Sequence, residues 1–273
     1  MNSSKTVILV KSASDRVARI TLNRPAKLNA INDQMQMELA DAIENVAMDD
    51  EMNVLIVTGA GRGFCSGGDT EELTGGSKTG AHDGKRGPEK LRRGFRNVHR
   101  IILGLHRMEK PTIAMVNGIA AGGGFDMAAA CDLRIGSPNA RFMSAFVRIG
   151  LFPAYGGTWL YPRIFGSVAK AAEMIFTGDF MEAEEANRHG LLNKLVPADK
   201  LESTTMELAR KIASGPPVAI RLAKTLLYKG LQMDLETSLL MSAAAAAVPL
   251  TTQDHQEGVS AFREKRKPQY RGM

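Results

Sequence analysis

Short apolar segments alternate with segments of helical character along roughly the first 150 residues, and this alternation limits the choice of fold. The apolar segments cover residues 5–10, 17–23, 53–59, 111–118 and 131–136. Runs of this length that are rich in valine, isoleucine and threonine are typical of β-strands. Because strands that alternate with helices pack as layers, the pattern predicts an α/β core.

Local signals place the elements between these strands. Asn32 or Asp33 can cap a helix whose expected apolar positions recur at three-residue spacing, namely Met37, Ala40, Ile43 and Val46. Residues 74–88 are rich in glycine and predict an insertion without regular structure. Residues 89–108 then read as a helix.

After Gly150 the chain becomes predominantly helical. The expected helical segments are residues 166–178, 182–190, 201–213, 216–228 and the alanine run 243–247, and residues 191–197 are the expected strand among them. We therefore expect an α/β core over residues 1–200 and an α-helical C-terminal region over residues 201–273.

The charge of the chain favours an anionic partner. Its net charge is +6 and its pI is near 9.4. The richest basic stretch, residues 85–100, contains Phe95 as its one aromatic residue, so a platform for stacking nucleic-acid bases is not indicated. A solvated helix face or the phosphates of a small ligand explains these charges better. We expect no nucleic-acid partner.

Membrane, secretory and metal-binding classes find no support in the sequence. No segment has the length and apolar character of a membrane span, and no signal-peptide pattern is present. Cys65 and Cys131 are too few for a disulfide framework and lack metal-ligand spacing. His99 and His106 would lie about 10 Å apart along a helix, too far to share an ion. We expect a cytoplasmic protein with no membrane partner and no metal.

The glycine-rich segment 59–69 (GAGRGFCSGGD) suggests two familiar kinds of site. A dinucleotide-binding loop needs its third glycine where Phe64 stands, and no nucleotide P-loop occurs in the chain. The G-x-C-x-G pattern around Cys65 resembles a nucleophile elbow, but an elbow follows its strand directly and GAGRG intervenes here. A thiol hydrolase stays open as an alternative, and a small buried Cys65 is the simpler interpretation.

Two loops, residues 66–69 (SGGD) and residues 121–126 (AGGGFD), each follow a strand and lead into an apparent helix. Backbone N–H groups at such positions can hold an anion or an oxyanion when no side chain intervenes. Asp126 ends the second loop, where it is either a helix cap or a catalytic group. Its position at a helix N-terminus should lower its pKa.

Six segments together resemble the enoyl-CoA hydratase/isomerase (crotonase) family, and they occur in the family's order: residues 23–31, 59–69, 110–135, 146–166, 177–197 and 257–270. Within the family, residues 142–163 are most similar to the phenylacetate-pathway enoyl-CoA isomerases. The resemblance implies a crotonase-like spiral of ββα units with an α-helical C-terminal region. It also implies an acyl-CoA substrate, no cofactor apart from that CoA, and a homotrimer or a dimer of trimers.

The resemblance further implies where the substrate binds. Backbone N–H groups of Gly68 and Gly123 would hold the thioester oxygen as it gains charge. The other CoA contacts that it implies are Ala26, Leu28, Ser66, Gly67 and Asp69, together with Phe262 and Lys265, which would reach the CoA of a neighbouring subunit. Because glycine has no side chain, a bare N–H can approach the thioester closely.

The family places acidic residues at three positions, and this chain keeps one of them. The matching residues are Asp126, Phe146 and Ala154. Moving a double bond needs one base that takes a proton and returns it elsewhere, so the pattern favours an isomerase with Asp126 as the proton shuttle. An enoyl-CoA hydratase with a non-standard second acid and a catalytically silent CoA-binding protein are the alternatives.

Several other residues are candidates near the reacting carbon. Glu71, Glu72 and Tyr155 are backup candidates for acid–base chemistry because they lie on loops that can face the acyl group. The acyl pocket should be shaped by residues 74–88 and by the helix that follows, including Leu91 and Phe95.

Overall fold

Two β-sheets organise the part of the chain that the computed structural model describes, which is residues 5–69, 71 and 94–273. The larger sheet consists, in spatial order, of β1 (Val7–Ser12), β2 (Val17–Leu22), β3 (Val54–Gly59), β4 (Thr112–Val116), β6 (Leu133–Gly136) and β9 (Lys194–Leu195). Strands β1 and β2 are antiparallel, and the other neighbours in this sheet are parallel. The smaller sheet contains β5 (Ile119–Ala121), β7 (Arg141–Met143) and β8 (Phe180–Glu182).

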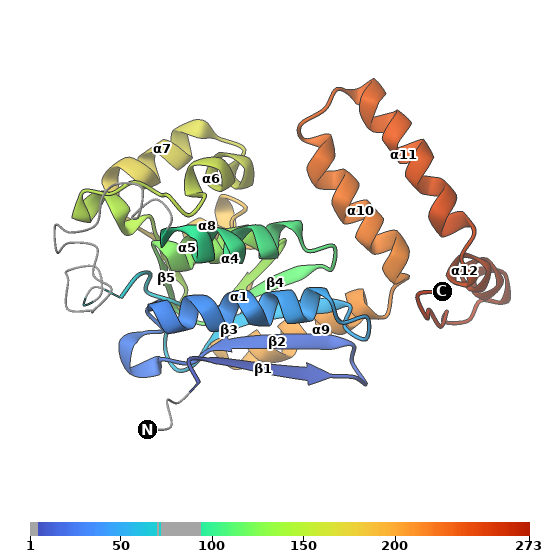
Figure 1. The fold of residues 1–273 in the computed structure, drawn as a ribbon, viewed down its shortest axis with the longest axis horizontal. Helices are drawn as coiled ribbons and strands as arrows, with labels where there is room; N and C mark the ends of the chain where they lie inside the picture. Colours follow the sequence, from blue (N-terminus) through green and yellow to red (C-terminus); the bar gives the residue numbers. More distant parts are fainter. Residues whose placement is uncertain (1–4, 70, 72–93) are drawn as a thin grey trace.

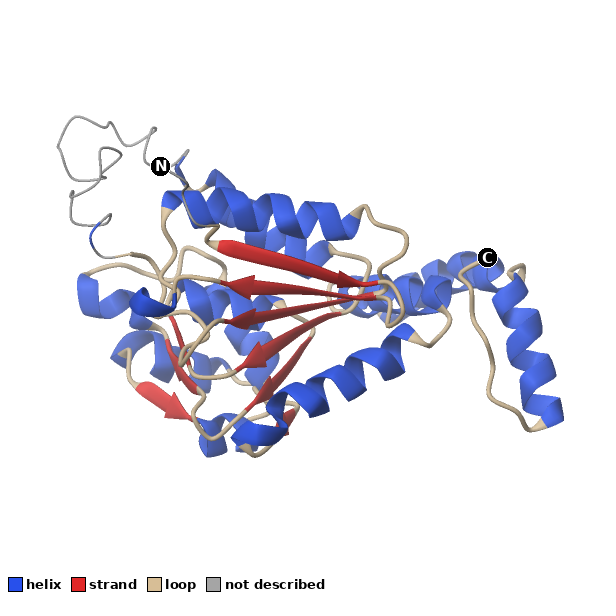
Figure 2. Ribbon diagram, turned by 90° about the horizontal axis from the view of Figure 1, so that it is seen from below, coloured by secondary structure: helices blue, strands red, loops and turns tan. Residues whose placement is uncertain are grey.

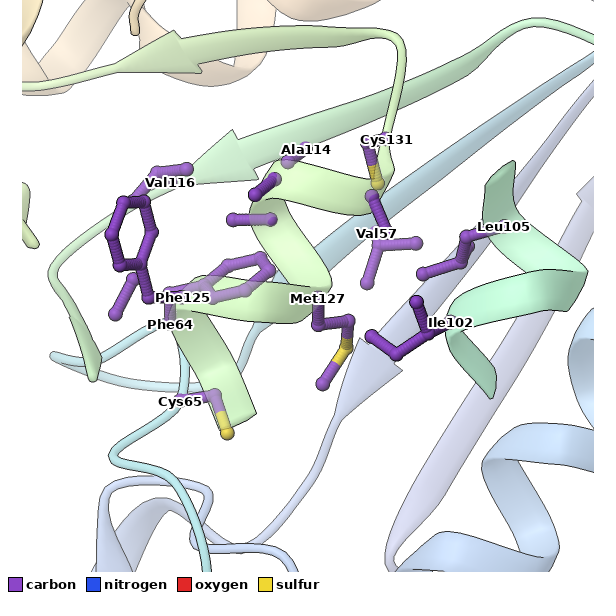
Figure 3. Close-up of a cluster of buried hydrophobic side chains, with 14 of the residues drawn as sticks. Val57, Phe64, Cys65, Ile102, Leu105, Ala114, Val116, Phe125, Met127 and Cys131 are labelled. Atoms are coloured by element: carbon purple, nitrogen blue, oxygen red, sulfur yellow. The ribbon is translucent and has the colours of Figure 1, made fainter. Parts of the chain in front are cut away.

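Helices cover both faces of the larger sheet (Figures 1 and 2). Because successive strand residues point to opposite faces, Leu55 and Val57 of β3 join one buried cluster and Val54 and Ile56 join another. The first cluster includes residues from α1 (Asp33–Ala47), α4 (Arg96–Arg107) and α5 (Gly123–Ala130), and Figure 3 shows part of it around Phe125. The second is covered by α9 (Leu201–Ala213).

The start of α1 confirms one sequence prediction and corrects another. Asn32 is the cap, since its side chain accepts a hydrogen bond of 2.9 Å from the N–H of Met35. The expected apolar position Met37 is wrong, because its side chain is 51% exposed. The buried face instead includes Met35 and Leu39, whose four-residue spacing follows the 3.6-residue helical repeat more closely.

The remaining elements fall into a group beside the small sheet and a C-terminal group. The first comprises α6 (Gly157–Phe165), α7 (Val168–Thr177) and α8 (Ala183–Arg188). Short 3-10 helices occur elsewhere along the chain, at Pro25–Lys27, Ala145–Ile149 and Ala198–Lys200. We call α10 (Pro217–Gly230), α11 (Leu235–Leu250) and α12 (Gln253–Glu264) the C-terminal arm. The arm projects away from the sheets in both views (Figures 1 and 2).

A buried ion pair fastens the first helix of the arm to the core. Lys224 of α10 lies 2.7 Å from the carboxylate of Asp132, which also accepts a hydrogen bond of 2.8 Å from the hydroxyl of Tyr228. Lys224 also donates a hydrogen bond of 3.0 Å to the carbonyl of Lys110. These contacts tie α10 to the loops at the ends of β4 and α5.

Most of the expected elements are present, and the differences concern short ones. The paired first strands, the strands at 53–59, 111–118, 131–136 and 191–197, and the helices after Gly150 are confirmed. The three-residue strands of the small sheet and the helices α6 and α12 were not predicted. The insertion at 74–88 lies outside the described residues, and the division of the chain at residue 200 stays a prediction. Among the helices of the described residues, none combines enough length and apolar character to cross a bilayer.

Candidate active site

Three segments that are distant in the sequence lie side by side next to the large sheet: residues 24–31, 59–69 and 119–126. Isolated parallel bridges join Ile31 to Gly68 and Cys65 to Ala120. The N–H of Ile31 donates a hydrogen bond of 2.7 Å to the carbonyl of Gly67. The N–H of Ala121 donates one of 2.9 Å to the carbonyl of Cys65. The two glycine-rich loops therefore have a fixed register relative to each other.

Asn29 holds two of these segments together, and the sequence analysis missed it. Its side chain is fully buried, and its amide nitrogen donates to the carbonyls of Ala60, Gly63 and Phe64 at 2.8–3.2 Å. Its amide oxygen accepts from the N–H of Arg24 at 2.9 Å. A buried asparagine that satisfies this many backbone groups is a scaffold for the loop. The sequence signal that could have indicated this role is the position of Asn29 in a turn, where its backbone has a positive φ of 58°.

The two loops touch where glycines remove the side chains. At Gly67, which has φ of +94°, an added Cβ would lie 2.8 Å from the carbonyl oxygen of Ala121 and 3.6 Å from the nitrogen of Gly123. At Gly122, which has φ of +49°, an added Cβ would lie 3.9 Å from the Cα of Gly67. A side chain at position 67 would therefore separate the loops.

Two N–H groups at this contact are available to a ligand. Gly123 is the first residue of α5, so its N–H has no partner within the helix. Gly68 lies between Gly67 and Asp69, whose backbone groups bond to Ile31, and its own N–H is not part of that pairing. Within the described residues, neither N–H donates a hydrogen bond to another group. The predicted pair of donors thus lies in neighbouring loops.

The expected CoA contacts of the core are also brought together. The N–H of Ser66 donates to the carbonyl of Leu28 at 3.0 Å, and Ala26 lies in the 3-10 turn just before Leu28. Asp69 is buried and forms an ion pair of 2.8 Å with Arg24. Burial acts to raise the pKa of Asp69, but the hydrogen bonds from Arg24 and from the N–H of Glu71, together with the charges of Arg24 and Lys27, outweigh it, and the pKa falls below its ordinary value. Asp69 is therefore a charged structural group.

The two expected contacts at the C-terminus lie elsewhere. Phe262 is 86% exposed on α12, and Lys265 follows the end of that helix. Helix α12 lies at the far end of the C-terminal arm from α5 (Figure 1). Within one chain these residues do not join Gly68 and Gly123.

Asp126 is enclosed and does not cap its helix. Gly122 is the residue before α5 and makes no side-chain cap, whereas Asp126 is the fourth residue of the helix. Its side chain is 0% exposed, and its Oδ1 accepts a short hydrogen bond from the hydroxyl of Tyr161 in α6. The other carboxyl oxygen, Oδ2, has no hydrogen-bond partner among the described residues. The interpretation of Asp126 as a cap is wrong.

The protonation of Asp126 also differs from the sequence prediction. Burial raises the pKa of Asp126 to about 7, and the hydrogen bond from Tyr161 opposes part of that rise. The expected lowering by the helix N-terminus is wrong because removal of water from the carboxylate outweighs it. A carboxyl group with a pKa near 7 can take up and release a proton at neutral pH.

The neighbouring segment 154–157 covers this face of α5. An added Cβ at Gly157 would lie 2.6 Å from Oδ1 of Asp126, so glycine is required for the pair with Tyr161. An added Cβ at Gly123 would lie 2.6 Å from the ring of Tyr155. Tyr155 therefore packs directly on the turn that carries the free N–H of Gly123.

The two other positions at which the resemblance leads us to expect an acid hold apolar side chains near Tyr155. The ring of Phe146 meets that of Tyr155 at a centroid distance of 5.9 Å, and Ala154 directly precedes Tyr155. The ring of Phe95 also meets that of Tyr155, at a centroid distance of 6.0 Å. Burial raises the pKa of Tyr155 to about 12, and the nearby Asp126 adds to the rise, so its hydroxyl is a proton donor rather than a base.

The remaining candidates find less support. Glu71 is exposed and forms an ion pair with Lys27, while Glu72 and Leu91 lie outside the described residues. Burial raises the pKa of the Cys65 thiol to about 12, which opposes formation of the thiolate that a thiol hydrolase needs. Cys65 is a fully buried side chain, as expected. In the described part of the chain, no three His, Cys, Asp or Glu residues are grouped so as to hold a metal ion.

Comparison with known proteins identifies the family of this chain. The family model described as enoyl-CoA hydratase/isomerase matches residues 12–273. Two similar proteins are a short-chain-enoyl-CoA hydratase of Clostridium acetobutylicum, 39% identical with 96% of this chain and 95% of that protein covered, and a 1,2-epoxyphenylacetyl-CoA isomerase of Escherichia coli, 36% identical with 94% and 95% covered.

Solved structures confirm the expected fold. The crystal structure of an enoyl-CoA hydratase from Bacillus anthracis is 34% identical to this chain, with a TM-score of 0.90 over 98% of this chain and 100% of that one. A structure described as a putative enoyl-CoA hydratase from Streptomyces coelicolor is 32% identical, with a TM-score of 0.91 over 100% and 96%. These structures have the crotonase fold, and the present chain shares it. With this fold and a family match that spans nearly the whole sequence, the chain belongs to the enoyl-CoA hydratase/isomerase family.

Proposed function

We propose that this protein moves a carbon–carbon double bond within an enoyl-CoA thioester. Asp126 takes a proton from C2 of a 3-enoyl-CoA, and the charge of the resulting dienolate collects on the thioester oxygen. The N–H groups of Gly68 and Gly123 donate to that oxygen. Asp126 then returns the proton to C4, so that the double bond lies between C2 and C3 and the composition of the substrate is unchanged.

The observation that carries this proposal is the placement of one buried carboxyl beside two free backbone donors. Gly123 and Asp126 are three residues apart on α5, so they lie on the same face of the helix about one turn apart. The Gly68 loop contacts the same turn through Gly67. Donors that are fixed before the reaction contribute most when charge develops on the oxygen that they face, about 2.7–4 kcal/mol for one donor.

The apolar residues at positions 146 and 154 favour isomerisation over hydration. Hydration of an enoyl thioester requires a bound water and a group that holds it, in addition to the proton carrier. The side chains of Phe146 and Ala154 have no polar group with which to hold that water. Proton exchange between two carbons needs one such carboxyl with a pKa near the working pH.

A CoA thioester also accounts for features away from the reacting carbon. A backbone hydrogen bond from Ser66 to Leu28 joins the two segments in which the CoA contacts are expected, residues 26–28 and 66–69. The net charge of +6 suits the phosphates of CoA. The proposed chemistry asks for no metal and no separate cofactor. Both cysteines are free and buried, which supports our expectation of a reducing compartment such as the cytoplasm.

We propose further that several copies assemble through the C-terminal arm. Large apolar side chains are exposed along its helices, including Leu227, Leu231, Leu235, Leu239, Leu240, Val248, Leu250 and Phe262. Exposed apolar surface on this scale is typical of a protein–protein interface. A homotrimer or a dimer of trimers would place Phe262 and Lys265 at the CoA of a neighbour. Light scattering after size-exclusion chromatography tests this, and a monomer at micromolar concentration would exclude it.

The reaction can be tested by incubating the purified protein with a 3-enoyl-CoA and, separately, with a 2-enoyl-CoA. We expect the 3-enoyl-CoA to be converted to the 2-enoyl-CoA without a change in mass. The gain of one water would instead support the second candidate, a hydratase, which the 39% identical Clostridium acetobutylicum protein favours. Binding of both thioesters without turnover would support the silent CoA-binding alternative.

The role of Asp126 is tested by Asp126→Asn, which keeps the shape of the side chain and removes its basicity. We expect the variant to fold and to bind the thioester, and to lose about 10²–10⁴-fold in kcat, the usual contribution of a general base. Turnover close to that of the wild-type protein would exclude Asp126 as the proton shuttle.

A further inference from the structure

A carboxylate that shuttles a proton has two equivalent oxygens, and the surroundings of Asp126 treat them differently. Oδ1 accepts the hydrogen bond from Tyr161, whereas Oδ2 has no partner among the described residues although it is buried. A buried oxygen without a partner is costly, so such oxygens are rare in folded proteins. Its presence next to the proposed reaction centre needs an explanation.

We propose that Tyr161 is a positioning residue for the proton transfer: its hydroxyl occupies Oδ1 of Asp126 and leaves Oδ2 as the oxygen that exchanges the proton with the substrate. This inference rests on the proposed function, because it assumes that Asp126 is the shuttle. Tyr161 itself does not touch the substrate in this arrangement.

The ring of Tyr161 is fixed, so its hydroxyl has one direction to point. The residue is fully buried, and its ring stacks on that of Phe125 at a centroid distance of 4.3 Å and an interplanar angle of 17°. Phe125 in turn packs against Phe142 at 5.5 Å. These ring contacts fix the orientation of the Tyr161 ring, and its hydroxyl donates to the carboxyl of Asp126.

A glycine next to the pair leaves the space that the two side chains need. Gly157 lies one helical turn before Tyr161, and an added Cβ there would lie 2.6 Å from Oδ1 of Asp126 and 2.7 Å from Cζ of Tyr161. Any larger residue at position 157 would force the two groups apart. The absence of a side chain at Gly157 is therefore needed for this hydrogen bond.

The hydroxyl of Tyr161 has a definite effect on the charge of Asp126. Donation stabilises the carboxylate and lowers the pKa of Asp126, in opposition to burial, which raises it. Burial and the proximity of Asp126 raise the pKa of Tyr161 itself well above its ordinary value, so the phenol keeps its proton and remains a donor.

Few titratable groups face the carboxyl from the elements packed around it. They are Tyr161 of α6, whose hydroxyl donates to the carboxyl, and Tyr155 of the preceding segment, whose pKa the carboxyl helps to raise. No charged side chain of the described residues contributes to the pKa of Asp126. Removing the hydroxyl of Tyr161 should therefore change the pKa of Asp126 without compensation from an ion pair.

The test is Tyr161→Phe, which deletes the hydroxyl and keeps the stacked ring. We expect the acidic limb of the pH profile of kcat to move upward by about one to two pH units, as a hydrogen bond to a charged group is worth this much. KM should change less than kcat. In parallel, the carbon NMR signal of the Asp126 carboxyl, assigned with Asp126→Asn, should titrate at a correspondingly higher pH.

Tyr228→Phe is the matched control. Its hydroxyl also donates to a carboxylate, that of Asp132, at 2.8 Å, but this pair joins α10 to the core. The same chemical change there should leave the acidic limb where it is in the wild-type protein.

The outcomes separate this inference from the proposed function. If Asp126→Asn is inactive while Tyr161→Phe keeps the wild-type acidic limb and carboxyl titration, the role of Tyr161 is overturned and the shuttle stands. If Asp126→Asn keeps wild-type turnover, both fail. Should Tyr161→Phe not fold, 3-fluorotyrosine at position 161 makes the phenol a stronger donor. The limb must then move to lower pH, and an unmoved limb overturns the inference.

Discussion

At the scale of the residue, Asp126 is under two opposing influences. Burial favours its neutral form, whereas the hydroxyl of Tyr161 favours its charged form, and the balance sets a pKa of about 7. Both forms are therefore populated at neutral pH, as a group that must accept and return a proton requires. The same balance has a measurable effect on the stability of the protein.

Stability should depend on pH through Asp126. The pKa of the carboxyl is higher in the folded protein, about 7, than the value of 3.8 for an unperturbed aspartate, so the folded state binds the proton more tightly. Its stabilising contribution is complete below about pH 4 and is lost as the pH rises towards 7. We expect the wild-type protein to lose about 1.4 kcal/mol per pH unit relative to Asp126→Asn over this range.

Urea unfolding of both proteins at one protein concentration, from about pH 4.5 to about pH 8, measures this difference over most of the interval between the two pKa values. Other titrating groups contribute equally to both proteins and cancel. A difference between the two free energies of unfolding that does not vary with pH would show that Asp126 titrates normally in the folded state.

At the scale of the element, the site depends on the contact between two loops. The free N–H of Gly123 begins α5, and the free N–H of Gly68 lies in a loop held by Asn29 and by bridges to Ile31 and Ala120. Neither loop contains both donors. Their function as a pair thus depends on the register that these contacts fix.

Two substitutions at Gly123 separate the N–H from the space around it. Gly123→Ala keeps the donor but places a Cβ against the ring of Tyr155, whereas Gly123→Pro does this and also removes the donor. Proline is tolerated at the first position of a helix, so α5 itself should persist. We expect kcat of the proline variant to be roughly 10²–10³-fold below that of the alanine variant. Equal rates in two folded variants would contradict a donor at Gly123.

The sequence predicted the elements better than it predicted the site. Strand β3 is a continuous apolar run and α9 has a clear helical repeat, so both follow from local pattern. The pair of Asp126 and Tyr161 could not be foreseen, because it joins residues 35 positions apart through a gap left by Gly157. The two glycine-rich loops were identified from local pattern, and the resemblance to the family singled out Gly68 and Gly123 within them. The role of these two residues as donors stays a prediction. The high pKa of Asp126 was missed because burial is a property of the whole fold.

At the scale of the whole molecule, the chain divides its surface between an enclosed site and an exposed arm. The helices α10, α11 and α12 pack little against the sheets, and their apolar side chains face outward. The attachment of α10 to the core therefore determines how the arm is presented. That attachment relies on Lys224, which is 8% exposed and paired with Asp132.

Lys224→Met should weaken this attachment. The substitution keeps most of the volume of the side chain and leaves Asp132 without its cation, and loss of one partner of a buried pair costs about 3–5 kcal/mol. We expect a lower unfolding temperature and partial dissociation of any assembly at low protein concentration. Lys229→Met, at an exposed position of the same helix, is the control and should change neither. Identical melting of both variants would contradict an anchoring role.

The free N–H groups of Gly68 and Gly123 belong to the main chain, and this affects how the protein can change over generations. Apart from a change to proline, no single substitution at either position deletes the donor itself. Carboxyl groups, in contrast, are gained or lost by one codon change. The part of the site that would hold the thioester is thus buffered against mutation, whereas the part that moves protons is free to vary. Descendants of such a protein can therefore acquire a different reaction through changes in their carboxyl groups while they keep the main-chain donors that would bind the substrate.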